Sequence, residues 1–239
     1  MPNQSAWDFH IAPLQVPAIE PEATWPGATW TVGSAVDLPM GGGLHFHCHI
    51  SSLAAAALPH PPHRHPDEEL IVPLCAPLDI VREADVLPLQ PGDAAFHPSE
   101  CLHTLQAGER RAAYVVLRWR TEHAEGAPAD DRSLVSDAAA TAHHAVAPGW
   151  LRTPLIDRPT RFLSRLRVHR TEMAAGCGYG WHKDDHDLAI VLVRGTVVSM
   201  TRRVAAPAIL LHRAGSLHDI RCEGPEGARW FAVELHRAT

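Results

Sequence analysis

The sequence predicts an all-β protein made of two similar domains in tandem. Its 239 residues are enough for two small β domains of about 100–120 residues each. Short runs rich in Val, Ile, Leu, Thr and Trp alternate with turns, because 21 Pro and 16 Gly are spread evenly along the chain. The order of these runs repeats on either side of a middle segment dense in Ala, Gly, Asp and His. This repeated pattern indicates many short strands arranged as two copies of one sandwich or barrel.

The expected strands follow one another with short turns, and helical periodicity appears only weakly, over residues 130–144. The middle segment lacks apolar alternation, so we expect a linker there. The predicted organisation is an N-terminal domain over 1–125, a linker over 126–148 and a C-terminal domain over 149–239. The expected strands cover residues 44–53, 70–74, 78–83, 114–120, 162–170, 188–200 and 230–236.

Composition excludes several classes of protein. The net charge of -6, without a block of like charges, leaves no basic face for a nucleic-acid partner. No long apolar run is present for a membrane span, and the N-terminal residues show no signal-peptide pattern. The five cysteines form no CxxC pair, which favours a reducing cytoplasm over a disulfide framework.

Histidine is unusually frequent, with 18 residues, and one group of these has ligand spacing. His63 and His65 lie two apart, so on an extended strand both imidazoles point to the same side. Glu69 follows at the start of an apolar run, and His103 comes after a Pro-Gly-Asp turn. Glu68 is an alternative to Glu69, although alternation turns it to the opposite face. Three imidazoles and one carboxylate suit a divalent transition metal and leave coordination positions open for a substrate.

These residues carry a resemblance to a known family. HPPHRHPDEEL followed by PGD and a later histidine resembles the two signature motifs of the cupin superfamily. The resemblance implies double-stranded β-helix (jelly-roll) barrels, with His63, His65, Glu69 and His103 as metal ligands. It covers about residues 44–120. One departure is Ala76, which stands where the first motif usually ends in glycine.

The second half resembles a degraded copy of the same motifs, so the whole chain is expected to be a bicupin, with two tandem cupin domains. The resemblance there covers about residues 161–236. Its matching positions are His182, Asp184 in place of a histidine, Asp187 in place of the glutamate, and His218. This set is a candidate for a second metal, with His186 as a competing ligand. The alternative is a scaffold barrel with a polar mouth.

A further histidine group alternates along one expected strand, at His45, His47 and His49. If this face looks inward, His47 and His49 are candidates for supporting groups or a general base in the cavity. If it looks outward, they form a polar surface.

The predicted function is a metal-dependent enzyme acting on a small organic substrate, with a dioxygenase as the leading hypothesis. The cofactor is one divalent transition metal in the N-terminal barrel. Iron or manganese is favoured, while zinc, nickel and copper also suit the ligands. The alternatives are a redox-neutral isomerase, lyase or hydrolase, and a non-catalytic small-ligand-binding protein. A homodimer is the expected assembly, because two-fold dimers are the commonest oligomers.

Overall fold

The computed structural model describes residues 9–18, 30–82, 85–122 and 132–237. Within these ranges every regular element is a β-strand, apart from one short 3-10 helix, η1 (Gly41–Gly43). The all-β prediction is confirmed. In the described part of the chain no helix has the length and apolar character needed to cross a membrane.

The N-terminal half contains a large and a small antiparallel sheet. The large sheet has six strands in the order β10-β7-β4-β9-β3-β2, and the small one has three in the order β6-β5-β8. The large sheet comprises β2 (Trp30–Pro39), β3 (His45–Leu53), β4 (Glu68–Pro73), β7 (Ala95–His97), β9 (Ala112–Arg120) and β10 (Leu134–Val135). The small sheet comprises β5 (Leu78–Arg82), β6 (Asp85–Leu89) and β8 (Thr104–Ala107).

The C-terminal half repeats this plan. Its large sheet has seven strands in the order β1-β18-β15-β20-β13-β12-β11, and its small sheet has four in the order β14-β19-β16-β17. The large sheet comprises β1 (Phe9–Pro13), β11 (His144–Ala147), β12 (Trp150–Arg158), β13 (Arg165–Met173), β15 (Asp187–Arg194), β18 (Ala208–His212) and β20 (Ala228–His236). The small sheet comprises β14 (Gly178–Lys183), β16 (Thr196–Ser199), β17 (Arg202–Ala205) and β19 (Leu217–Cys222).

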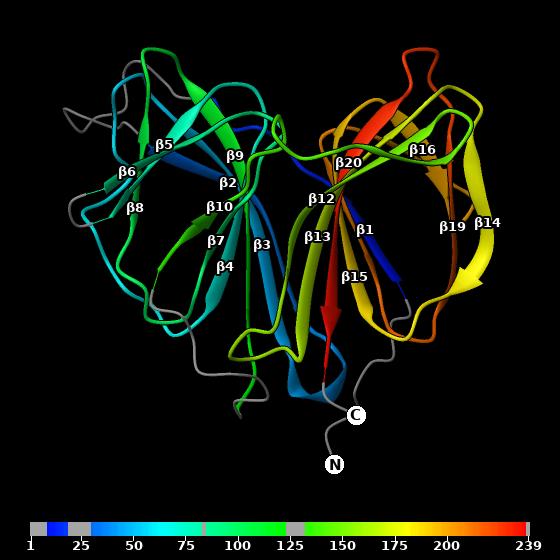
Figure 1. Ribbon diagram of the computed structural model, residues 1–239, viewed down its shortest axis with the longest axis horizontal. Helices are drawn as coiled ribbons and strands as arrows, with labels where there is room; N and C mark the ends of the chain where they lie inside the picture. The colour runs from blue at the N-terminus through cyan, green and yellow to red at the C-terminus, as the bar shows by residue number, and fades with distance from the viewer. Residues whose placement is uncertain (1–8, 19–29, 83–84, 123–131, 238–239) are drawn as a thin grey trace.

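The two halves lie side by side, and their large sheets meet at the centre of the molecule (Figure 1). One apolar core joins them, with Phe46 and Leu117 from the N-terminal half packed among Val168, Leu211 and Phe231 from the other. Successive strand residues point to opposite faces, so the central strands contact the partner half on one face and their own small sheet on the other. All six residues of β4 are buried for this reason.

Three strands pair in places that the predicted domain bounds do not indicate. β1 belongs to the N-terminal part of the chain, yet it pairs with β18 of the C-terminal half over five residue pairs. The expected linker contains β10, which pairs with β7, and β11, which pairs with β12. Residues 126–131 of that linker lie outside the described residues. Each end of the described linker segment is therefore part of a sheet.

Candidate metal centre

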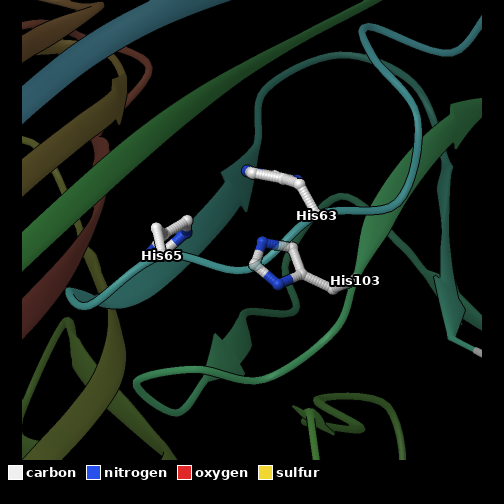
Figure 2. Close-up of side chains that lie close together, drawn as sticks. All are labelled: His63, His65 and His103. Atoms are coloured by element: carbon white, nitrogen blue, oxygen red, sulfur yellow. The ribbon is translucent and has the colours of Figure 1, made fainter.

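His63, His65, Glu69 and His103 converge in the N-terminal half. His63 forms an isolated β-bridge with His103, which brings the two distant segments together. The Nε2 atoms of His65 and His103 lie 3.4 and 3.2 Å from the two carboxylate oxygens of Glu69. One nitrogen from each of His63, His65 and His103 lies within 4.8 Å of the other two. Figure 2 shows the three imidazole rings turned toward one another.

Backbone carbonyls fix the orientation of two of these rings. His65 Nδ1 lies 3.0 Å from the Asp67 carbonyl oxygen, and His103 Nδ1 lies 2.9 Å from that of Cys101. A carbonyl only accepts, so each Nδ1 is the donor and each ring turns its Nε2 toward the cluster. Metal-binding histidines are held in this way, by a hydrogen bond from the nitrogen that does not bind the ion. The residues present therefore fit a metal.

The charge states of the cluster also suit an ion. Burial alone would raise the pKa of Glu69, but hydrogen bonds from His103 and His65 outweigh it and hold the pKa well below its usual range. Burial and the neighbouring histidines lower the pKa of His63 to about 4. An ionised carboxylate and neutral imidazoles are the forms that bind metal ions.

Glu68 and Glu69 point to opposite faces of β4, as strand alternation predicts. Glu68 is fully buried between the two halves, where its carboxylate accepts hydrogen bonds from Trp119 Nε1 at 2.7 Å and Thr160 Oγ1 at 2.7 Å. The backbone N–H of Arg161 donates a third, at 2.8 Å. Glu68 therefore serves the contact between the halves, and Glu69 faces the histidines.

A cavity of about 370 Å³ opens beside this cluster. His47 and His49 both line it, in agreement with the inward orientation considered for them, and the His47 Nε2 and His49 Nδ1 atoms lie 3.1 Å apart. Burial and the neighbouring His47 lower the pKa of His49 to about 4, so its imidazole is neutral near pH 7. His45 is exposed and contacts Asp37 at 2.8 Å. The other lining residues include Ile71, Leu105, Tyr114, Val116 and Arg118.

The sequence analysis did not single out His97, which the structure places beside the cluster. His97 lies opposite Glu69 in the β4–β7 pair, is fully buried, and stacks on His103 with ring centres 4.0 Å apart. Its Nδ1 lies 2.6 Å from Ser133 Oγ. The sequence feature that could have indicated His97 is its position at the end of the run Ala95-Phe96-His97, just before the segment that ends in His103.

The second candidate set is only partly assembled. His182, Asp184 and His218 form a cluster, with His218 Nε2 3.3 Å from Asp184 Oδ2. The Nδ1 atoms of His182 and His218 contact the carbonyl oxygens of Gly180 and Ser216, the same arrangement as in the first cluster. His186 lies at its edge, with Nε2 3.9 Å from Asp184 Oδ2.

Asp187 does not join this cluster, contrary to the expected match with the motif glutamate. Its carboxylate accepts a hydrogen bond from the Ala214 N–H at 2.9 Å and contacts Arg237 at 3.2 Å. Leu188 lies opposite His212, as Glu69 lies opposite His97, so Leu188 occupies the position of the glutamate. Asp187 follows Asp184 one residue too early, and strand alternation turns it toward the other half, as it turns Glu68.

Comparisons with known proteins bear on the fold. No family model and no curated protein matches the sequence. Among solved structures, a candidate glyoxylate-induced protein from Pseudomonas aeruginosa matches with a TM-score of 0.73 and 16% identity, covering 98% of this chain and 91% of that one. Protein Ylba from E. coli matches with a TM-score of 0.68 and 14% identity, covering 97% and 93%. Oxalate decarboxylase from Bacillus subtilis, a protein with Mn(II) centres, matches with a TM-score of 0.66 and 10% identity, covering 87% and 73%.

These solved structures are cupin-fold proteins. The chain has the cupin fold. At identities of 10–16% the likeness shows the fold alone, and cupin barrels carry many unrelated activities.

Proposed function

We propose that the chain is a metal-dependent bicupin enzyme with its active site in the N-terminal half, acting on a small organic substrate. In this proposal the two sheet pairs are two tandem jelly-roll barrels. The observation that carries it is the convergence of three imidazoles and one carboxylate, with two of the rings oriented by carbonyl oxygens. Such a cluster beside a cavity is a natural place for a small substrate.

The proposed ligands are His63, His65, Glu69 and His103, and the proposed ion is iron or manganese. Manganese gains support from the Mn(II) centres of oxalate decarboxylase, while zinc, nickel and copper also bind such ligands. When bound, a divalent ion of this kind polarises a substrate oxygen or, as iron, manganese or copper, activates dioxygen.

The chain's own residues provide binding and proton transfer. Arg118 lines the cavity with its Nε 4.0 Å from Glu69 and its NH2 group 3.4 Å from Asp67, so a substrate carboxylate entering there meets a guanidinium. The neutral His49 imidazole can accept a proton from the substrate. Burial raises the pKa of Tyr114, which therefore keeps its proton and can donate a hydrogen bond. The apolar walls from Ile71 and Leu105 limit the water beside the reacting atoms.

Oxygen consumption and turnover distinguish the possible reaction classes from one another. A dioxygenase is the leading form of the proposal, and it consumes oxygen when substrate is added. A redox-neutral isomerase, lyase or hydrolase turns over without net oxygen uptake. A non-catalytic binder retains its metal and ligand but shows no turnover with any substrate that binds.

The test is the metal content of purified wild type, His65→Ala and the control His144→Ala, which removes an exposed histidine far from the cluster. Expression without added metal and gentle purification keep the natural ion. We expect about one iron or manganese per chain in wild type and in the control, and its loss in His65→Ala. About two per chain, falling to one, would show that His182, Asp184 and His218 also hold an ion. No metal after reconstitution with Fe(II), Mn(II) or Zn(II) would remove the proposal.

A further inference from the structure

We propose that the cavity of the C-terminal half binds a small organic carboxylate with an aromatic or other apolar body, and that Arg152 and Trp150 recognise its carboxylate. This site is separate from the N-terminal cluster, and its recognition of the anion uses side chains rather than a metal ion.

The cavity has room for such a molecule. Its volume is about 450 Å³, larger than the 370 Å³ beside the N-terminal cluster. Apolar and aromatic side chains form much of its wall, and Trp150 and Tyr179 stack there with ring centres 5.1 Å apart. Leu188 and Trp230 complete this apolar surface. A flat or branched apolar body suits these walls better than a strongly hydrated one.

Two buried donors in this cavity have no acceptor in the described part of the chain. Trp150 and Arg152 lie two apart on β12, so both side chains point to the same face of the sheet. Trp150 Nε1 and Arg152 Nε are both buried, and neither has a hydrogen-bond partner among the described residues. Buried donors are nearly always satisfied, because leaving one unpaired is costly. A pair of them on one cavity wall points to an acceptor supplied by a ligand.

The charges of the cavity identify that acceptor as an anion. Arg167 contacts Glu234 at 3.4 Å, and Asp184 contacts His218 at 3.3 Å, so these charged groups have partners inside the protein. Arg152 has no carboxylate partner in the described part of the chain, and its guanidinium lies 5.7 Å from the centre of the Trp150 ring. The planar guanidinium offers two parallel N–H groups that match the two oxygens of a carboxylate.

The N-terminal half provides an internal comparison. Trp30 begins β2 as Trp150 begins β12, and two residues further along the strand stand Val32 and Arg152. The fold therefore does not require an arginine at this position, since the first half folds with valine. The same C-terminal half has Leu188 in the position of the metal-binding glutamate. The N-terminal cavity thus has the full candidate ligand set, whereas the C-terminal cavity has Leu188 in the position of Glu69 and an arginine, Arg152, with no carboxylate partner among the described residues.

The experiment is isothermal titration of the intact protein with benzoate and with benzamide, an uncharged molecule of nearly the same shape. The variants are Arg152→Met, Arg152→Lys and the control Arg203→Met, which removes an exposed arginine of the same half that pairs with Glu223. We expect wild type to bind benzoate at least tenfold more tightly than benzamide. Arg152→Met should lose this preference, Arg152→Lys should retain part of it, and Arg203→Met should retain all of it.

Several outcomes would overturn the proposal. One is the absence of benzoate binding at concentrations up to about 10 mM, which is tenfold above the millimolar dissociation constant of a weak specific ligand. Another is benzoate affinity that survives in Arg152→Met but is lost in Arg118→Met, which would assign the ligand to the N-terminal cavity. A third is binding that disappears when the protein is treated with a chelator, because a metal ion and not Arg152 would then hold the anion. Thermal unfolding of each variant, measured alongside, separates loss of the site from loss of the fold.

Discussion

The buried carboxylate of Glu68 allows the contact between the two halves to be tested directly. Glu68 comes from β4 of the N-terminal half, while two of its donors, Thr160 and the Arg161 N–H, come from the loop before β13. Trp119, from β9, provides the third. Replacing Glu68 with Ala removes the acceptor and leaves all three donors buried between the halves.

The expected magnitude follows from these contacts. Each hydrogen bond to a charged group contributes about 1.5–3 kcal/mol, but contributions within one network do not add fully. Glu68→Ala leaves three buried donors without an acceptor, at about 1–3 kcal/mol each and with incomplete additivity, so we expect it to reduce the free energy of unfolding by about 3–5 kcal/mol. For a chain of this length, the midpoint of thermal unfolding should fall by roughly 6–20 °C. Glu68→Gln, which keeps the volume and one acceptor oxygen, should lie between Ala and wild type.

Urea and thermal unfolding followed by tryptophan fluorescence provide the assay, with Glu109→Ala as an exposed control. A loss for Glu68→Ala no larger than that of the control would refute the assignment of Glu68 to the contact between the halves. The pH dependence gives a second check, because burial raises the pKa of Glu68 even though its hydrogen bonds lower it. A raised acid pKa makes the folded protein bind the proton more tightly, so this stabilisation is complete below about pH 4.5 and declines as the pH rises through the folded pKa. The difference between wild type and Glu68→Ala should therefore shrink from pH 4 to pH 8.

Three further predictions concern other parts of the molecule. Burial, with Arg152 and Arg167, lowers the pKa of His169 to about 3, so this group destabilises the fold as the pH falls below 6.5, by up to about 1.4 kcal/mol per pH unit. His169→Gln should make the stability between pH 6.5 and pH 4 less dependent on pH than in wild type, and equal slopes in urea unfolding would contradict this. His97→Phe keeps a ring stacked on His103 but removes a nitrogen that lies within 4.8 Å of ligand atoms of Glu69 and His103, and we expect metal affinity to fall by about 10–100-fold, measured by chelator competition. Deletion of residues 1–14 removes β1 and exposes the edge of β18, which should lower the unfolding midpoint and raise the oligomeric state above that of wild type in size-exclusion chromatography. An unchanged midpoint and oligomeric state would show that the edge needs no cover.

Most of the first candidate metal cluster could be predicted from the sequence because the geometry of His63, His65 and Glu69 is local. His63 and His65 share a face through the two-residue repeat of extended chain, and Glu69 begins a strand that the apolar run made visible. His103 lies far from this segment in the sequence, and only the family resemblance connected the two. His97 was missed because its approach to the cluster depends on β4–β7 pairing, which no local pattern reveals.

The second half shows where such reasoning ends. Asp187 and Leu188 are adjacent in the sequence, and only the observed register shows which of them faces the histidines. The same limit applies to β1, because the run Phe9-His10-Ile11 is compatible with a strand but carries no information about which half supplies its partner. Arg152 likewise belongs to no recognisable motif. Its Nε is buried without an acceptor among the described residues, and only the three-dimensional structure shows this.

The pairing of β1 with β18 joins two strands that are translated at very different times. Pro13 lies opposite Ala208, so about 195 residues must be translated after the first strand before its partner exists. At about 5–20 residues per second this interval is roughly 10–40 s. During that time the nascent chain can complete the sheets of its first half, while its leading strand still has no neighbour with which to form a ladder. The C-terminal sheet therefore cannot pair its edge strand β1 until β18 has been translated, although β1 is made before every other described strand.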